Sequence, residues 1–296
     1  MRPELRNRVV VGLTLALGLI AGVWHDLHSH GHLVLGAAAL LAAAGGCREF
    51  TRLARSRAAE VQFIPMLVIS LLVVAEALLH QAAASVGQRL ADTLPLIPLL
   101  LGLGLAWTAL QQMFSQATER FFVNVGGTLL GMIYLGVPLN LVLRLLMLDT
   151  PENGSRGVFL TLLFIVAVKS GDIAAYFGGR ALGRRKLAPR ISPGKTWEGF
   201  ACSFLGAVIG VYVFRALLMS SLFGLADPFD APWKPALWAV VLAPLGVVGD
   251  LVESCMKRDA SVKDSGSLLP GFGGVLDVLD AILIAAPVAY ALALIL

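Results

Sequence analysis

Long apolar segments alternate with short polar connections along the whole chain. A helix that crosses a lipid bilayer needs about 20 mostly apolar residues. Segments close to that length predict nine membrane-spanning helices, near residues 9–24, 32–47, 61–79, 94–111, 121–147, 157–177, 200–222, 235–252 and 273–296. Unbroken apolar runs of this kind exclude a membrane β-barrel, whose strands alternate between apolar and polar residues.

Two of these segments differ from a simple membrane-spanning helix. The first could pass for a signal peptide, but it lacks a clean small-residue cleavage site, so we expect it to be retained as a span. The fifth is long and contains Gly136-Val137-Pro138. Because a proline removes one backbone hydrogen bond from a helix, we expect the fifth span to be kinked or split in two.

Composition narrows the class of protein. Of the 296 residues, 57% are hydrophobic and only 14% are charged, whereas soluble proteins carry about 25% charged residues. A soluble globule this apolar could not cover its surface with polar groups, and disordered chains are polar. The three cysteines are far apart and odd in number, which excludes a disulfide scaffold. The sequence therefore predicts an all-α, polytopic integral membrane protein.

Basic residues are concentrated in alternate connections. The opposite connections hold only Arg89, Arg156 and Lys234. Lysine and arginine mark cytoplasmic connections, so we expect a cytoplasmic N-terminus and a C-terminus on the far side. The same bias explains the net charge of +4 without nucleic acid as a partner. The basic connections contain Arg2, Arg6, Arg8, Arg48, Arg52, Arg55, Arg57, Arg120, Arg180, Arg184, Arg185, Lys186, Arg190, Lys195, Lys257, Arg258 and Lys263.

The two halves of the chain differ in their polar content. Residues 1–156 form about five spans that are poor in polar residues, and residues 157–296 hold the candidate chemistry. Ionisable groups within membrane spans are costly and are functional candidates by default. Three clusters of them stand out, and the predicted orientation places all three at the cytoplasmic edge.

The first two clusters lie on either side of one connection. Lys169 and Asp172, followed by Tyr176, end the sixth span, where a simple ion pair on one helix face is the alternative. The connection itself contains Ser192, Lys195 and Thr196, donors that suit an anion at the start of the seventh span. A true phosphate-binding P-loop needs a glycine where Pro189 stands, so we reject it. Contact with anionic lipid headgroups remains the alternative.

The third cluster combines two helices. Asp250, Glu253, Ser254 and Lys257 share one helix face, and Asp277 and Asp280 share a face of the last span. Carboxylates that meet repel one another unless a cation lies between them, and oxygen-only ligands favour Mg²⁺. Ion pairs at the helix end, Asp250 or Glu253 with Lys257, are the alternative. These residues suggest a membrane-embedded, Mg²⁺-dependent enzyme for a phosphate-bearing substrate.

The residues of these clusters resemble those of a known family, the phosphatidate cytidylyltransferases (CDP-diacylglycerol synthases). The resemblance covers roughly residues 165–285, and includes Tyr176–Arg180, Lys186–Pro189 and Ile191–Gly199. The family's histidine is Phe272 here, the arginine that follows the first motif aspartate is Val278, and Ile173 and Ala174 also depart from the pattern. The signature matches Ser254, Lys257, Arg258, Lys263, Asp264, Gly266, Leu269, Pro270, Gly273, Gly274, Asp277 and Asp280.

The resemblance implies transfer of a cytidylyl group from CTP to phosphatidic acid, which gives CDP-diacylglycerol and diphosphate for phospholipid biosynthesis. A phosphate monoester is already ionised near neutral pH, so the absent histidine need not abolish activity. The implied catalytic residues are Asp250, Asp277, Lys257, Arg258, Lys263 and Asp264. The implied substrate-binding residues are Ser192, Lys195, Thr196, Trp197, Ser254 and Tyr176. The implied ligands of one or two Mg²⁺ ions are Asp250, Asp277, Asp280 and Asp172.

The resemblance also places the protein in a bacterial inner membrane, among membrane lipids, with its active site on the cytoplasmic face. A homodimer is left open. Two other functions remain as alternatives: a CTP-dependent polyprenol or phytol kinase (or a synthase for ether lipids), and a non-catalytic transporter or scaffold. Four histidines between His25 and His32 could bind zinc, but they lie on the far side, where we expect a solvated loop.

Overall fold

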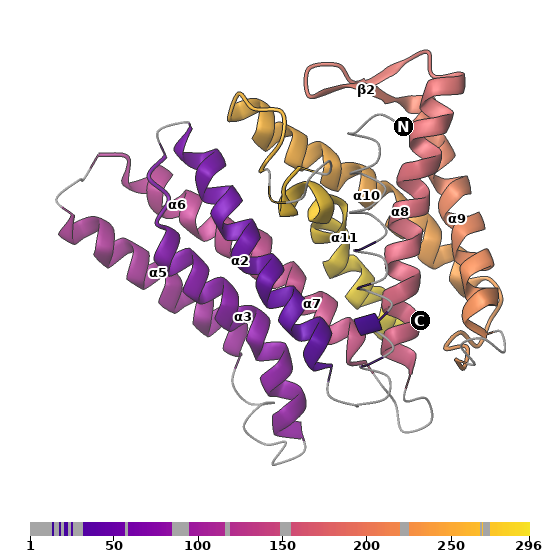
Figure 1. The fold of residues 1–296 in the computed structure, drawn as a ribbon, viewed down its shortest axis with the longest axis horizontal. Helices are drawn as coiled ribbons and strands as arrows, with labels where there is room; N and C mark the ends of the chain where they lie inside the picture. Colours follow the sequence, from indigo (N-terminus) through magenta and orange to yellow (C-terminus); the bar gives the residue numbers. More distant parts are fainter. Residues whose placement is uncertain are drawn as a thin grey trace. The chain divides into compact units, whose positions relative to one another are not determined.

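The computed structural model describes most of the chain (Figure 1). Its described parts contain eight helices long and apolar enough to cross a membrane, which confirms an all-α polytopic membrane protein. The predicted first span, 9–24, lies almost wholly outside them, so the count of nine stays a prediction. The described residues are 32–56, 59–84, 95–115, 119–148, 155–219, 225–266, 268 and 273–296, with Thr14, Gly18, Ala21, Gly22 and His25.

Several helices continue past the predicted edge of the membrane. The second predicted span, expected to end near residue 47, extends to Arg55, where Arg52 and Arg55 lie in the last turn. Basic side chains stabilise the partial negative charge at a helix C-terminus, so the polar connection begins as helix. The membrane helices are α2 (Leu33–Arg55), α3 (Phe63–Ala84), α5 (Leu96–Phe114), α6 (Phe121–Gly131), α7 (Val137–Leu146), α8 (Arg156–Leu182), α9 (Trp197–Met219), α10 (Lys234–Asp259) and α11 (Val275–Ile295).

The fifth predicted span is interrupted but not divided. A π-helical turn, η1 (Met132–Gly136), joins α6 to α7, and the three together run from Phe121 to Leu146. Such turns insert one extra residue into the hydrogen-bonding pattern. Here the turn ends directly before Val137 and Pro138. Pro138 lacks a backbone N–H, so it already breaks that pattern.

A short β-hairpin stands where the sequence predicted only a loop. Strand β1 (Lys186–Ala188) pairs antiparallel with β2 (Ser192–Thr196). Glu198, in the first turn of α9, accepts hydrogen bonds from the backbone N–H groups of Arg184 and Arg185. The Thr196 hydroxyl accepts the N–H of Gly199 at 3.1 Å and so caps α9. The hairpin is thereby tied to the start of a membrane helix.

Contacts divide the chain into two compact units. One comprises residues 1–143 and 256–278, and the other comprises residues 144–255 and 279–296. These units follow contacts rather than chain position, so the sequence-based division at residue 156 stays a prediction. Helices α10 and α11 each contribute residues to both units.

In the second unit, α8 and α9 pack closely through small residues. A Cβ atom at Gly178 would overlap the Cys202 side chain, and one at Gly206 would overlap Ala174. Small residues let the backbones of membrane helices approach each other. Phe159, Phe164 and Trp238 are fully buried in this unit.

The first unit has more buried polar groups than the sequence suggested. Asn140 of α7 is fully buried and donates hydrogen bonds to the Glu76 carboxylate at 2.8 Å and to the Val73 carbonyl at 2.6 Å. Glu76 and Glu49 are themselves only 4% and 3% exposed. Buried polar groups of this kind need hydrogen-bond partners, and here the helices supply them. Near the N-terminus, His32 is 4% exposed, which contradicts the expected solvated loop at that residue.

Candidate active site

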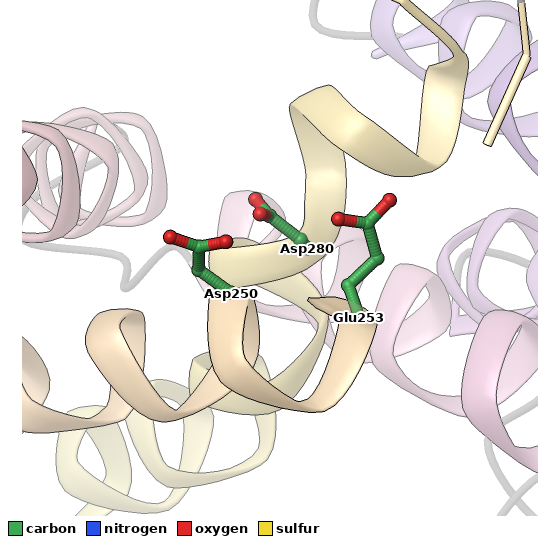
Figure 2. A group of neighbouring side chains, drawn as sticks. All are labelled: Asp250, Glu253 and Asp280. Carbon is green, nitrogen blue, oxygen red and sulfur yellow. The ribbon is translucent and has the colours of Figure 1, made fainter. Parts of the chain in front are cut away.

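Three carboxylates converge in the second unit. Asp250 and Glu253 lie one turn apart on α10 and flank Asp280 of α11 (Figure 2). One oxygen from each of the three lies within 4.8 Å of the others. Glu253 is fully buried and Asp280 is 8% exposed, whereas the Asp250 side chain is 38% exposed. The cluster therefore reaches from a buried position to an accessible one.

A glycine lets the two helices meet at this point. A Cβ atom at Gly249 would overlap the carbonyl oxygen of Asp280 and come within 2.7 Å of the Ala281 Cα atom. Only a residue without a side chain permits that approach of α11 to α10. The glycine that precedes Asp250 thus brings the acidic faces of two helices together.

The β-hairpin contributes a cation to the cluster. Lys195 on β2 forms an ion pair with Asp250, with 2.7 Å between Nζ and Oδ2, and also donates to the Val247 carbonyl at 3.1 Å. On the other side of Asp250, the Ser254 hydroxyl lies 3.4 Å from Oδ1. The sequence predicted that Lys195 binds a phosphate. The structure pairs its ammonium group with Asp250, and phosphate binding stays a prediction.

Helix α8 adds two charges to the same unit. Asp172 interacts electrostatically with Lys195 and Asp250, and a Cβ atom at Gly246 of α10 would lie 3.7 Å from its Oδ1 atom. Lys169, one turn earlier, interacts electrostatically with Asp172 and Asp280. Lys169 was considered in the sequence only as a partner of Asp172, and its reach to α11 could not be read from spacing.

Asp277 has a different environment, within the first unit. Its Oδ1 atom accepts a hydrogen bond from Lys257 Nζ at 2.7 Å. Its Oδ2 atom accepts from the backbone N–H of Ser265 at 3.0 Å, the Ser265 hydroxyl at 2.8 Å and the Gly274 N–H at 2.7 Å. Four contacts occupy most of the acceptor capacity of one carboxylate. This aspartate therefore links Lys257 at the end of α10 with Ser265 and with Gly274 at the start of α11.

The other predicted site residues differ in how far their side chains are exposed. Thr196 is buried, and its hydroxyl caps α9. Trp197 is 54% exposed and packs edge-on against Phe200, while Tyr176 is 62% exposed and packs against Phe177. Phe272 lies outside the described residues. Exposed or half-buried positions are occupied by Ser192, Val278, Arg258, Lys263 and Asp264.

The carboxylate cluster fits a magnesium ion by its donor set. All three ligand candidates offer oxygen, and Mg²⁺ binds oxygen at about 2.0–2.1 Å, so opposite ligands stand about 4 Å apart. Small side-chain movements would bring Asp250, Glu253 and Asp280 onto one ion. Glu253 was noted in the sequence for its helix face but not among the metal ligands. Its burial against α11 is a tertiary property.

Known proteins similar to this chain point to one kind of chemistry. A family model described as the cytidylyltransferase family matches residues 6–296. A phosphatidate cytidylyltransferase of Chlamydia trachomatis is 38% identical over 176 residues, which are 58% of this chain and 55% of that protein. Proteins of the same name are 39% identical over 146 residues in Haemophilus influenzae (49% of each chain) and 45% identical over 161 residues in Brucella suis (54% of each). The chain spans about half the length of the curated relatives it matches.

Proposed function

The chain belongs to the cytidylyltransferase family, and on that premise we propose that it is a membrane-embedded phosphatidate cytidylyltransferase. In the proposed reaction, a phosphate oxygen of phosphatidic acid attacks the α-phosphorus of CTP. A new phosphorus–oxygen bond forms, the bond to the β-phosphate oxygen breaks, and diphosphate leaves. The lipid product is CDP-diacylglycerol. The names of the three relatives support this substrate pair.

The observation that carries the proposal is the convergence of Asp250, Glu253 and Asp280, with Lys195 paired to Asp250. Three carboxylates this close repel one another, and one ammonium group offsets only part of their charge. A site of this charge pattern suits a divalent cation that carries phosphates. It does not suit an apolar ligand or a passive structural contact.

We propose that Asp250, Glu253 and Asp280 hold Mg²⁺, with Asp172 as a further acidic neighbour. When bound, Mg²⁺ would neutralise charge on the phosphates of CTP and on the leaving diphosphate. A second ion, with Asp277 as a ligand, stays a prediction. Asp277 would have to give up some of its four hydrogen bonds to bind a metal.

Basic residues would help to position the phosphates of the substrates. Lys195 can exchange its bond with Asp250 for a phosphate oxygen once a cation neutralises that carboxylate. Lys257, Arg258 and Lys263 are the candidates for the triphosphate. Catalysis of such a transfer rests mainly on orientation and charge stabilisation. The attacking phosphate is already ionised near neutral pH, so no histidine is required at position 272.

Ser192, Thr196 and Ser254 would add hydroxyl contacts to phosphate groups. A hydroxyl can donate one hydrogen bond while it accepts another, so the cap that Thr196 provides for α9 is compatible with a contact to a ligand oxygen. Trp197 and Tyr176 are exposed aromatic rings that suit stacking on cytosine or contact with the lipid. Asp264 is exposed near the signature glycines.

The protein is an integral membrane protein, and we propose the cytoplasmic face of a bacterial inner membrane for its active site. The basic connections, including the hairpin, support that face through their charge. CTP is a highly charged cytoplasmic nucleotide, so a site on this face would meet it directly. The substrate phosphate of phosphatidic acid lies at the same interface.

The decisive experiment uses purified protein in detergent with phosphatidic acid, Mg²⁺ and CTP labelled in the cytosine ring. Label in the organic phase that disappears when EDTA removes the metal is the expected result. CDP accumulation without lipid label would instead support a CTP-dependent lipid kinase. If circular dichroism shows that the protein is folded and neither product forms, that result would favour a transporter or scaffold and overturn the proposal.

A further inference from the structure

Helix α11 begins without a side-chain cap of its own. The residue before its first turn is Gly274, and the first N–H groups of any helix lack partners within the helix. Asp277, the third residue of α11, accepts the Gly274 N–H at 2.7 Å. This bond is one half of a capping box. The other half requires an acceptor on the capping residue, and glycine has no side chain to supply it.

Glu49 of α2 supplies the missing acceptor. Its Oε1 atom accepts the Val275 N–H and its Oε2 atom accepts the Leu276 N–H, both at 2.9 Å. Glu49 is 3% exposed, so its charge is shielded from water by the protein. A carboxylate at a helix N-terminus also stabilises the helix dipole. A residue of the N-terminal half therefore completes the cap of the last membrane helix.

Glu49 and Asp277 are joined through a third residue. The Ser265 hydroxyl lies 3.0 Å from Glu49 Oε2 and 2.8 Å from Asp277 Oδ2. One hydroxyl carries one hydrogen, so it donates to one carboxylate at a time while it contacts both. Any movement of Glu49 would therefore be transmitted to the Asp277 carboxylate.

Two glycines of the connecting segment make room for this arrangement. A Cβ atom at Gly266 would overlap the Glu49 carboxylate and lie 2.8 Å from its Cδ atom. A Cβ atom at Gly274 would overlap both Ser265 Oγ and Glu49 Oε2. The close approach of Glu49 thus gives a physical reason for glycine at both positions of the signature.

We propose that Glu49 is a positioning residue for the transfer reaction. It caps α11 from α2 and holds the Asp277 carboxylate so that Oδ1 faces Lys257, 2.7 Å away. Glu49 acts through Asp277 and Ser265 and does not contact the substrates itself. The proposal rests on the proposed function for its kinetic consequence, whereas the cap is independent of it.

The test compares Glu49→Gln with Glu76→Gln. Both replace a carboxylate that is almost fully buried in the first unit, but Glu76 is hydrogen-bonded to Asn140 of α7. In Glu49→Gln an amide group must face N–H donors, so hydrogen exchange at residues 275–277 should accelerate. The kcat/KM for CTP should fall about 10- to 100-fold, and half-saturation with Mg²⁺ should need a higher concentration, as is typical when a residue that orients a metal-binding carboxylate is changed. Glu76→Gln should change none of these three quantities.

A second pair of variants remains informative if Glu49→Gln does not fold. Gly266→Ala displaces the Glu49 side chain, and Gly126→Ala adds the same methyl group to open space. Gly266→Ala should reproduce the kinetic and exchange changes, while Gly126→Ala should resemble the wild type. Unchanged exchange in both Glu49→Gln and Gly266→Ala would overturn the cap and the proposal. Faster exchange with wild-type kinetics would overturn the positioning role alone.

Failure of the proposed function gives a separate result. Wild-type protein without cytidylyl transfer would overturn the function, but the exchange comparison would still decide whether Glu49 caps α11. A uniform loss of folded protein with normal kcat/KM and Mg²⁺ dependence in the remaining fraction would show a merely structural role. That outcome would also contradict the proposal.

Discussion

Asp277 and Asp280 lie one helical turn apart on α11, yet their surroundings differ. Asp277 accepts four hydrogen bonds from protein groups. Asp280 lies beside Asp250 and Glu253 and accepts the backbone N–H of Ala281. Sequence spacing treats these two residues alike. Their partners predict that the same substitution lowers stability at Asp277 but not at Asp280.

Asp277→Asn should lower both activity and stability. An amide would present hydrogens to groups that are themselves donors, which costs roughly 2 kcal/mol or more of the free energy of unfolding. Thermal unfolding in detergent, together with the lipid-label assay, measures both effects. An unchanged midpoint would contradict the anchoring role of Asp277.

Asp280→Asn should lose activity without losing stability. Replacing one of three neighbouring carboxylates relieves repulsion in metal-free protein, so the midpoint in EDTA should equal or exceed that of the wild type. Activity should fall on the order of 100-fold if Asp280 binds the metal. The same unfolding scan, with and without Mg²⁺, checks the prediction. Near-normal turnover would remove Asp280 from the metal site.

Lys195→Met tests the cation that the hairpin brings to Asp250. Loss of its ammonium group should reduce kcat/KM on the order of 100-fold, comparable to the removal of one charged donor from a transition state. Lys186→Met, at the exposed first position of strand β1, is the matched control and should remain within about twofold of the wild type. Equal losses in the two variants would indicate a general effect of hairpin charge.

At the scale of elements, the approach of α8 to α9 depends on glycine. A methyl group at Gly206 would overlap Ala174 and lie 2.9 Å from the Ser170 carbonyl oxygen. Overpacking at such a contact costs about 1–3 kcal/mol, so Gly206→Ala should unfold at a lower temperature. Gly102→Ala adds a methyl group to open space on α5 and should not be destabilised. Equal midpoints for the two variants would refute the close packing.

The whole molecule has a predicted orientation that is open to direct measurement. In a variant whose native cysteines are replaced by serine, Lys186→Cys marks the hairpin and Asp230→Cys marks the connection before α10, where the Asp230 side chain is 75% exposed. In right-side-out membrane vesicles, a membrane-impermeant maleimide should label only the Asp230→Cys protein. Labelling of the hairpin position instead would invert the orientation derived from the basic residues.

Much of the fold could be predicted from the sequence, since each span must satisfy its own backbone hydrogen bonds in lipid. That local rule accounts for eight described helices close to their predicted positions. It fails at the C-terminal end of α2, which extends to Arg55, and at β1 and β2. The hairpin depends on hydrogen bonds that the Glu198 carboxylate accepts from the N–H groups of Arg184 and Arg185. The periodicity of the sequence does not predict such bonds.

The candidate site was only partly predictable. Spacing along α10 and α11 was sufficient to select Asp250, Asp277 and Asp280, because residues three or four apart share a helix face. The sequence by itself therefore determined the membrane class, the helical build and the acidic faces, all of which follow from local composition and helical period.

Only the tertiary structure decided which of these groups meet. It paired Lys195 with Asp250 and placed the buried Glu253 beside Asp280. It also joined Asp277 to Lys257 and Ser265 by hydrogen bonds. It also brought Glu49, more than two hundred residues earlier, onto the first turn of α11. Contacts between distant segments depend on how helices pack, and the glycines that allow this packing are recognisable only once their neighbours are known.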